Sequence, residues 1–137
     1  MEPRLSFVTL GVSDLKRATA FYVDVLHLPQ VETPPAISFF ELGRTYLALF
    51  PRADLCADAG LPDVSPSAPG AFPGFTLAHN VRSASEVDQL LAEVAAGGGR
   101  IVQKGRPRPE FNGYSGYFAD PDGFLWEVAF NPSFPHL

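Results

Sequence analysis

Glu127 is the residue whose type and position most directly suggest chemistry. It lies in the run 124–130, which follows the turn sequence 120–123 and is expected to form a β-strand. Alternation along a strand puts Glu127 on the face opposite the large side chains, with Leu125 and Ala129 as same-face neighbours. A carboxyl group in apolar surroundings suits a general acid or base, or binds a cation. Glu127 is therefore the candidate catalytic residue. The alternative is a structural carboxylate paired with an internal Arg or Tyr.

Histidine and cysteine offer few further candidates, because the chain has 3 His and 1 Cys. His79 lies in the expected strand 75–81, and its parity is opposite to that of Thr76. It is either a partly buried structural histidine or, together with Glu127 and a second chain, a metal ligand. Cys56 has no His near it in the sequence and no partner for an internal disulfide.

Two arginines mark a possible anion site. Arg106 and Arg108 lie in the segment 106–114, which contains Pro107 and Pro109 and is expected to be a loop. Paired guanidinium groups clamp a carboxylate or phosphate, and the alternative is a pair of solvated surface charges. The run Gly97-Gly98-Gly99 ends a helix, which is the wrong polarity for binding phosphate at a helix N-terminus.

Composition bounds the protein class. The chain has 137 residues, 46% hydrophobic and 18% charged, which is typical of one globular domain. Its net charge of −5 argues against nucleic acid or an anionic membrane as a partner. No apolar run approaches the roughly 20 residues of a membrane span, and the first residues do not resemble a signal peptide. We therefore expect a cytoplasmic protein.

The elements expected around these residues occur twice in the same order. A Pro-rich linker, residues 52–74, separates a first unit at 4–51 from a second at 75–131, with a tail at 132–137. The first unit is expected to contain strands at 5–12, 30–33, 37–42 and 45–50, and a helix at 15–26. The second is expected to contain strands at 75–81, 100–104, 114–119 and 124–130, and a helix that begins after Ser83. The sequence thus predicts two βαβββ units.

This order, with three short motifs, resembles the vicinal oxygen chelate superfamily, which includes glyoxalases, bleomycin-resistance proteins and dioxygenases. The motifs are Val-Ser-Asp-Leu at 12–15, Ala-Phe-Tyr at 20–22 and Asp-Pro-Asp-Gly-Phe-Leu-Trp-Glu at 120–127. The resemblance implies an α+β fold, the glyoxalase/bleomycin-resistance/dioxygenase fold, within one domain over residues 1–137. Each βαβββ unit would roll a mixed sheet into a cup, with helices on the convex side and ligand or metal on the concave side.

The resemblance also implies four metal-ligand positions, of which this chain keeps one. They correspond to Phe7, Ala48, Thr76 and Glu127. Phe and Ala cannot bind a metal, and a Thr hydroxyl is a poor ligand for a divalent ion. We therefore expect no metal cofactor, with a divalent metal ion as the alternative.

The cup is otherwise expected to be aromatic. Strand parity predicts which aromatic side chains point into the cup, and one of Phe39 and Phe40 is expected to join them. For the last two strands this prediction assumes that Ala119 pairs with Phe124 across the turn. The predicted ligand-binding residues are Phe7, Tyr46, Ala48, Phe50, Thr76, Tyr114, Phe118, Leu125 and Glu127, with Arg106 and Arg108 at the rim.

These residues leave two functional hypotheses open. The first is a bleomycin-resistance-like protein that binds a small aromatic or cationic organic molecule without metal. The second is a metal-dependent enzyme, either a glyoxalase-like lyase or isomerase or a dioxygenase. The resemblance further implies a homodimer.

Overall fold

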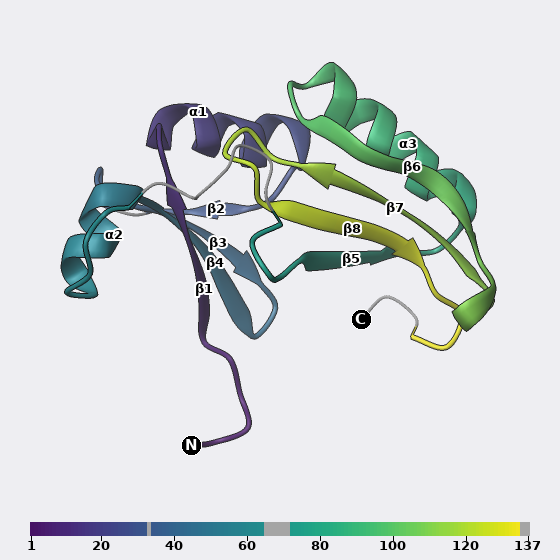
Figure 1. Ribbon diagram of the computed structural model, residues 1–137, viewed down its shortest axis with the longest axis horizontal. Coiled ribbons are helices and arrows are strands. Elements are labelled where there is room, and N and C mark those ends of the chain that lie inside the picture. The colour runs from purple at the N-terminus through teal and green to yellow at the C-terminus, as the bar shows by residue number, and fades with distance from the viewer. Residues whose placement is uncertain (33, 65–71, 135–137) are drawn as a thin grey trace. The chain divides into compact units, whose positions relative to one another are not determined.

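The computed structural model describes residues 1–32, 34–64 and 72–134 of the chain. The chain divides into two compact units, residues 1–71 and residues 72–137. Each unit contains a four-stranded mixed sheet with a helix packed on one face (Figure 1). The expected α+β class and the repeated order of elements are therefore confirmed.

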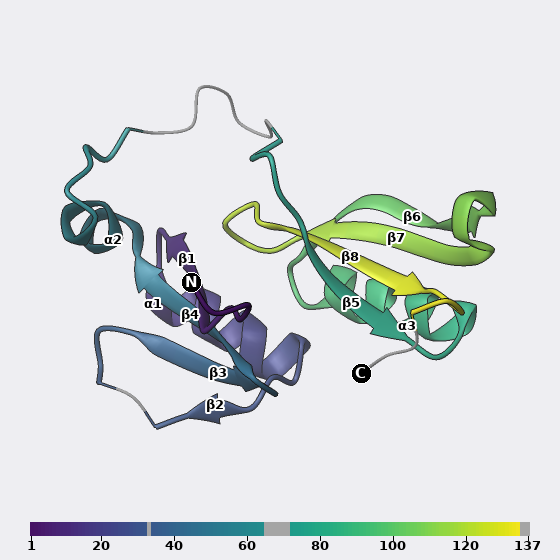
Figure 2. The ribbon, with the colours of Figure 1, turned by 90° about the horizontal axis from the view of Figure 1, so that it is seen from below.

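The first unit is built on the sheet β1-β4-β3-β2. Strand β1 runs parallel to β4, and the remaining pairs are antiparallel, as the side-by-side strands of Figure 2 show. Its elements are β1 (Phe7–Val12), α1 (Leu15–Ala20), a π-helical turn (Phe21–Val25), β2 (Gln30–Val31), β3 (Ser38–Leu42), β4 (Thr45–Pro51) and α2 (Arg52–Asp58).

Helix α1 covers one face of this sheet. It begins where the Asp14 carboxylate accepts a hydrogen bond from the Arg17 N–H at 3.0 Å. The buried rings of Phe21 and Tyr22 belong to the π-helical turn, and Tyr22 lies 5.7 Å from the Phe40 ring. The expected helix 15–26 therefore changes from α to π geometry at Phe21.

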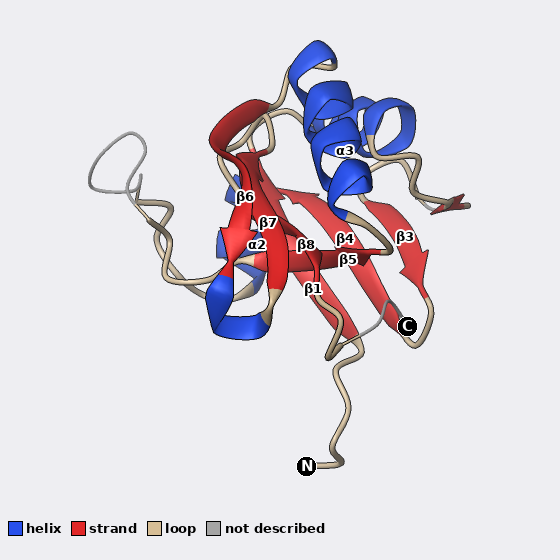
Figure 3. Cartoon of the chain, turned by 90° about the vertical axis from the view of Figure 1, so that its right-hand side faces the viewer, coloured by secondary structure: helices blue, strands red, loops and turns tan. Residues whose placement is uncertain are grey.

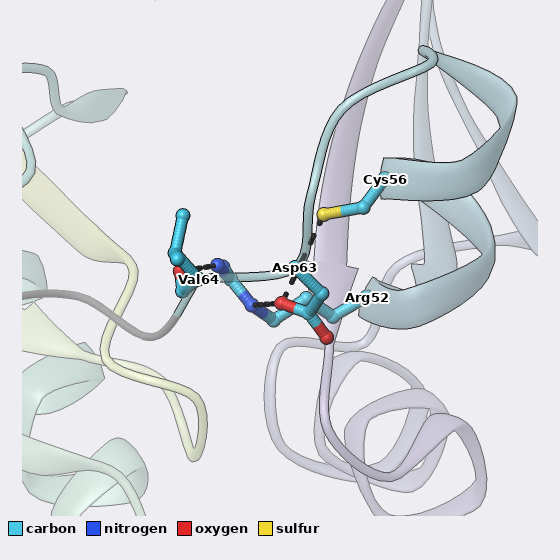
Figure 4. A network of polar contacts seen from close by, with 4 residues as sticks. All are labelled: Arg52, Cys56, Asp63 and Val64. Carbon is cyan, nitrogen blue, oxygen red and sulfur yellow. Dashed lines mark hydrogen bonds and ion pairs between the residues drawn. The ribbon is translucent and has the colours of Figure 1, made fainter.

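Helix α2 lies inside the segment that we expected to be a linker, so that expectation is wrong for residues 52–58. The sequence from Arg52 to Asp58 contains no Pro, and its prolines stand on either side. Arg52 fastens the helix to the following chain by an ion pair with Asp63 at 2.7 Å and a hydrogen bond to the Val64 carbonyl (Figure 4). Residues 65–71 of the predicted linker lie outside the described residues.

The second unit is built on the sheet β5-β8-β7-β6, in which β5 runs parallel to β8. Its strands and its long helix are distinguished by colour in Figure 3. The elements are β5 (Leu77–Val81), α3 (Ala84–Ala96), β6 (Arg100–Arg108), a 3-10 turn (Pro109–Phe111), β7 (Gly113–Ala119) and β8 (Leu125–Phe130).

Helix α3 covers one face of this second sheet. Ser83 caps it by accepting a hydrogen bond from the Glu86 N–H at 3.2 Å, as the sequence predicts. The Glu86 carboxylate in turn accepts from the N–H of Arg82 at 2.9 Å. The stripe facing the sheet is fully or nearly buried and comprises Val87, Leu91 and Val94.

Strand β6 is longer than expected. We predicted a strand at 100–104 followed by a loop, but pairing with β7 continues to Arg108 through two irregularities in register. Pro107 is accommodated because β6 lies at the edge of the sheet, where a missing N–H breaks no ladder. Arg106 and Arg108 are therefore strand residues.

The β7–β8 loop sets the register of the second sheet, and the predicted pairing of Ala119 with Phe124 is wrong. Ala119 pairs with Leu125, because the loop takes in Phe124. The side chain of Asp120 accepts hydrogen bonds from the N–H groups of Asp122 and Phe124, at 3.0 and 2.8 Å. This Asx-type turn lengthens the loop by one residue, and a shift of one residue exchanges the two faces of β7.

Candidate functional site

The first unit presents an aromatic surface on the sheet face opposite α1. The Phe7 ring lies 5.4 Å from the Tyr46 ring in a stacked arrangement and 5.6 Å from the Phe39 ring. These rings come from the neighbouring strands β1, β4 and β3. We call this surface, formed by Phe7, Phe39 and Tyr46, the aromatic face.

Strand register determines which of the two neighbouring Phe residues joins the aromatic face. Phe39 pairs with Ala48, whose partner on β1 is Thr9, two residues from Phe7. Phe40 pairs with Leu47 and is 0% exposed beneath α1. The sequence left this choice open, and the structure selects Phe39.

The aromatic face is accessible and carries a carboxylate. Phe7 is 49% exposed, so solvent reaches the ring that contacts both of the others. Glu41 pairs directly with Tyr46 and is exposed, so its carboxylate shares this face. The surface combines aromatic rings with a negative charge, which suits a planar or cationic organic group.

Helix α2 borders one end of the aromatic face. A side chain at Gly11, which has the same parity as Phe7, would contact Leu55 at 3.3 Å and the Arg52 backbone at 3.4 Å. Gly11 pairs with Phe50, so the predicted inward direction of Phe50 agrees with the register. Ala48 lies between Phe50 and Tyr46 on the same face and is buried.

The second unit presents a polar surface on the sheet face opposite α3. Glu127 pairs with Tyr117 on β7 and with Ala78 on β5, and Tyr117 pairs with Gln103 on β6. These four residues form one row across the sheet. Ser115 lies two residues from Tyr117 and is 0% exposed. We call Gln103, Ser115, Tyr117 and Glu127 the polar face.

Arg108 joins the residues of the polar face. Its Nε donates to the Ser115 hydroxyl at 2.8 Å, and its Nη2 donates to the Gln103 side-chain oxygen at 2.7 Å. The guanidinium carbon lies 5.7 Å from the centre of the Tyr117 ring. Two hydrogen bonds and one ring contact thus fix the orientation of this side chain.

The pKa of Tyr117 depends on burial and on the charged groups around its hydroxyl. Burial raises the pKa of Tyr117, and the hydrogen bond to Glu127 and the charge of that carboxylate raise it further. The positive charges of Arg108 and Arg106 act in the opposite direction and lower this pKa. All four groups therefore lie close enough to interact.

Two predicted site residues lie on the other side of this sheet. Phe118 and Tyr114 have the parity of Trp126, the partner of Phe118, rather than that of Glu127. Phe118 is 1% exposed and stacks on Trp126 at 6.2 Å, while the Tyr114 hydroxyl donates to Asp88 on α3 at 3.1 Å. Their predicted direction is wrong because the loop 120–124 is one residue longer than assumed.

The polar face also contains residues that the sequence analysis missed. Gln103, Ser115 and Tyr117 were assigned to no site, because the assumed register placed Ser115 and Tyr117 under the helix. Asp120, an Asx-turn residue, was the available signal for the longer loop. Leu125 and Glu127 have the predicted common face, and His79 pairs with Val128 on the opposite one.

Metal-binding proteins of the family that this sequence resembles hold the metal at four positions, and the residues at those positions here do not provide a set of metal ligands. Phe7 and Ala48 belong to the first unit and offer no donor atom, while Thr76 precedes β5 and is exposed. Glu127 interacts with Tyr117. Within residues 1–32, 34–64 and 72–134, no three His, Cys, Asp or Glu residues are grouped so as to hold a metal ion. These side chains do not fit a resident divalent metal.

Comparison with known families identifies the chain. Residues 4–128 match the family model of the Glyoxalase/Bleomycin resistance protein/Dioxygenase superfamily. The chain belongs to this superfamily. The crystal structure of a glyoxalase-related enzyme from Fulvimarina pelagi is 33% identical, with a TM-score of 0.85, and the match covers 97% of this chain and 91% of that one.

Other members of the superfamily differ in the activities that their names state. A lactoylglutathione lyase from Agrobacterium tumefaciens is 27% identical, with a TM-score of 0.67 and 93% coverage of both chains. The metallothiol transferase FosB of Shouchella clausii is 27% identical over 125 residues, which are 90% of this chain and 77% of that protein. No described helix of this superfamily member is long and apolar enough to cross a membrane.

Proposed function

We propose that this protein binds a small aromatic or cationic organic molecule, without a metal, at the aromatic face of its first unit. The contact of Phe7 with both Phe39 and Tyr46 supports this proposal most directly. A metal-binding member of the superfamily would need a donor at position 7, whereas this chain places a half-exposed ring there. The position then contributes apolar area in place of a ligand atom.

The charge near the aromatic face favours a cation. Glu41 lies opposite Tyr46 on the same face, and the whole chain has a net charge of −5. An organic cation over an aromatic ring gains about 0.5–2 kcal/mol, and the larger values apply where water is excluded. We propose that the protein sequesters such a molecule. We further propose that it does so as a homodimer in the cytoplasm.

Titration with benzyltrimethylammonium tests this function. Isothermal titration calorimetry and two-dimensional NMR in the presence of EDTA should show saturable binding, with shifts confined to β1, β3 and β4. Phe7→Ala should weaken binding by about 10-fold, because it removes the ring that contacts both others. The matched control is Phe75→Ala, which removes an exposed ring from the second unit.

Two results would contradict the proposal. One is the absence of binding by benzyltrimethylammonium and by its neutral counterpart benzyl alcohol. The other is binding that appears only after a divalent metal is added.

The names of two relatives support a metal-dependent lyase or transferase as the second candidate function. That candidate predicts about one tightly held Zn²⁺, Ni²⁺, Mn²⁺ or Fe²⁺ per chain by elemental mass spectrometry, lost on Glu127→Ala.

A further inference from the structure

Arg108 is a half-buried cation whose hydrogen-bond partners are both neutral. Its Nε and Nη2 donate to the oxygens of Ser115 and Gln103, and no carboxylate of the described chain pairs with it. A guanidinium that is fixed in place and partly removed from water, without a counter-ion, favours the binding of an anion.

The geometry leaves one end of this guanidinium available. Among the described residues, none accepts a hydrogen bond from Nη1 of Arg108, because the two bonds above use Nε and Nη2. Arg108 lies over the Tyr117 ring, which holds the guanidinium plane beside the polar face. The available donors therefore belong to a side chain that is already ordered, so binding loses little conformational entropy.

The local charge favours a monoanion. Arg106 is exposed and close enough for its charge to act on Tyr117, and Glu127 interacts with the same hydroxyl. Two arginines and one carboxylate give this surface a net charge of about +1. One carboxylate group neutralises that charge, whereas a dianionic phosphate would exceed it and would need more donors than Nη1 supplies.

We propose that the polar face binds the carboxylate of a small organic acid through Arg108, with Arg106 as a second, solvent-exposed charge. This proposal rests on residues of the second unit alone and does not depend on the function proposed for the aromatic face. Glu127 lies beside the site as a like charge, so it disfavours the anion and restricts which acids bind.

Cyclohexanecarboxylate and cyclohexanecarboxamide provide the test, because they have the same ring and differ in charge. Neither contains an aromatic ring that could stack on the aromatic face. Titration with cyclohexanecarboxylate should shift the NMR signals of the backbone N–H groups of Ser115 and Tyr117 and of the Arg108 Nε–H. Cyclohexanecarboxamide should bind at least about 10-fold more weakly than cyclohexanecarboxylate. Inorganic phosphate, as a second anion, should bind more weakly than the carboxylate.

Variants separate the contributions of the charged groups. Arg108→Gln should weaken cyclohexanecarboxylate binding by about 10-fold or more, and Arg106→Gln by about 3-fold. Glu127→Gln should tighten it by about 3-fold, because it removes the like charge. Arg100→Gln is the matched control, since Arg100 is exposed at the start of the same strand, and it should leave binding unchanged.

Arg108→Lys keeps the proposal testable if Arg108→Gln fails to fold. This variant retains the charge and loses the planar fork that Ser115 and Gln103 hold. It should bind cyclohexanecarboxylate about 3-fold to 10-fold more weakly than the unmodified chain. Equal binding of the carboxylate and the amide would overturn the proposal, as would tighter binding of phosphate. It would also fail if cyclohexylammonium binds and Glu127→Gln abolishes that binding.

Discussion

Tyr117 and Glu127 are direct partners on the neighbouring strands β7 and β8, and their side chains interact on the face opposite α3. This pairing joins the one ligand-type residue kept at a family metal position to a phenol and two arginines. It makes Glu127 part of a polar network rather than an isolated acid in an apolar cup.

The first prediction concerns the ionisation of Tyr117. Glu127→Gln should lower the pKa of Tyr117, because it removes the charge that disfavours the phenolate. Arg108→Gln should raise the pKa, because it removes a charge that favours the phenolate. A ¹³C NMR titration of the tyrosine side chains measures both changes in pKa. Tyr114 is the internal control, because its pKa is raised by burial and by Asp88 rather than by Glu127 or Arg108. An unchanged Tyr117 in Glu127→Gln would contradict the assigned pairing.

The same shift predicts how stability depends on pH. The pKa of Tyr117 is raised in the folded state, so this group stabilises the folded chain. Its contribution to the free energy of unfolding is fully present at pH values below the ordinary tyrosine pKa of about 10. That contribution is lost as the pH rises through the higher folded-state pKa. Tyr117→Phe should therefore reduce the fall in the free energy of unfolding above about pH 10, measured by urea denaturation at several pH values. An identical alkaline profile in Tyr117→Phe would show that this group does not contribute.

The second prediction contrasts two adjacent phenylalanines. Phe40→Ala should lower the free energy of unfolding by about 3–5 kcal/mol, because Phe40 is fully buried against Tyr22. Phe39→Ala should cost at least about 2 kcal/mol less, because Phe39 lies on the partly exposed aromatic face. Denaturant unfolding of the two variants measures the difference. Equal losses would mean that the β3 register is wrong.

The third prediction tests the packing of α3 on its sheet. Gly116→Ala should destabilise the chain by about 2–3 kcal/mol, because the added methyl group would lie 2.6 Å from Leu91 and 2.8 Å from the Gln103 carbonyl oxygen. Gly11→Ala is the matched control in the first unit. Its methyl group would have 3.3 Å to the flexible end of Leu55, so its cost should be smaller. Thermal and chemical unfolding compare the two, and a neutral Gly116→Ala would place Gly116 outside this interface.

The fourth prediction concerns the loop that sets the β7–β8 register. Asp120→Ala should lower the free energy of unfolding by about 2–3 kcal/mol, since the buried carboxylate accepts from both Asp122 and Phe124. Asp120→Asn keeps an oxygen acceptor and should be the milder change. Cross-strand NOEs between Ala119 and Leu125 report the register directly. Their replacement by an Ala119–Phe124 contact in the unmodified chain would refute the assigned pairing.

The sequence by itself determined the repeated elements. Hydrophobic periodicity and the caps Asp14 and Ser83 are local signals, so both main helices and most strands could be placed without coordinates. Parity within β1 and β4 correctly placed Phe7 and Tyr46 on one face. The absence of donor atoms at Phe7 and Ala48 was also readable, because it depends only on side-chain chemistry.

Tertiary structure decided which residues meet Glu127. Strand alternation has a period of two, so the single extra loop residue held by Asp120 moved Phe118 and Tyr114 to the helix side and brought Tyr117 to the face of Glu127. The choice between Phe39 and Phe40 depended in the same way on pairing with β4. Arg108 reached Ser115 because β6 continues past its Pro107, which only its edge position permits. Register and edge position are properties of the assembled sheet, and Asp120 was the one local signal for them, through its Asx-type turn.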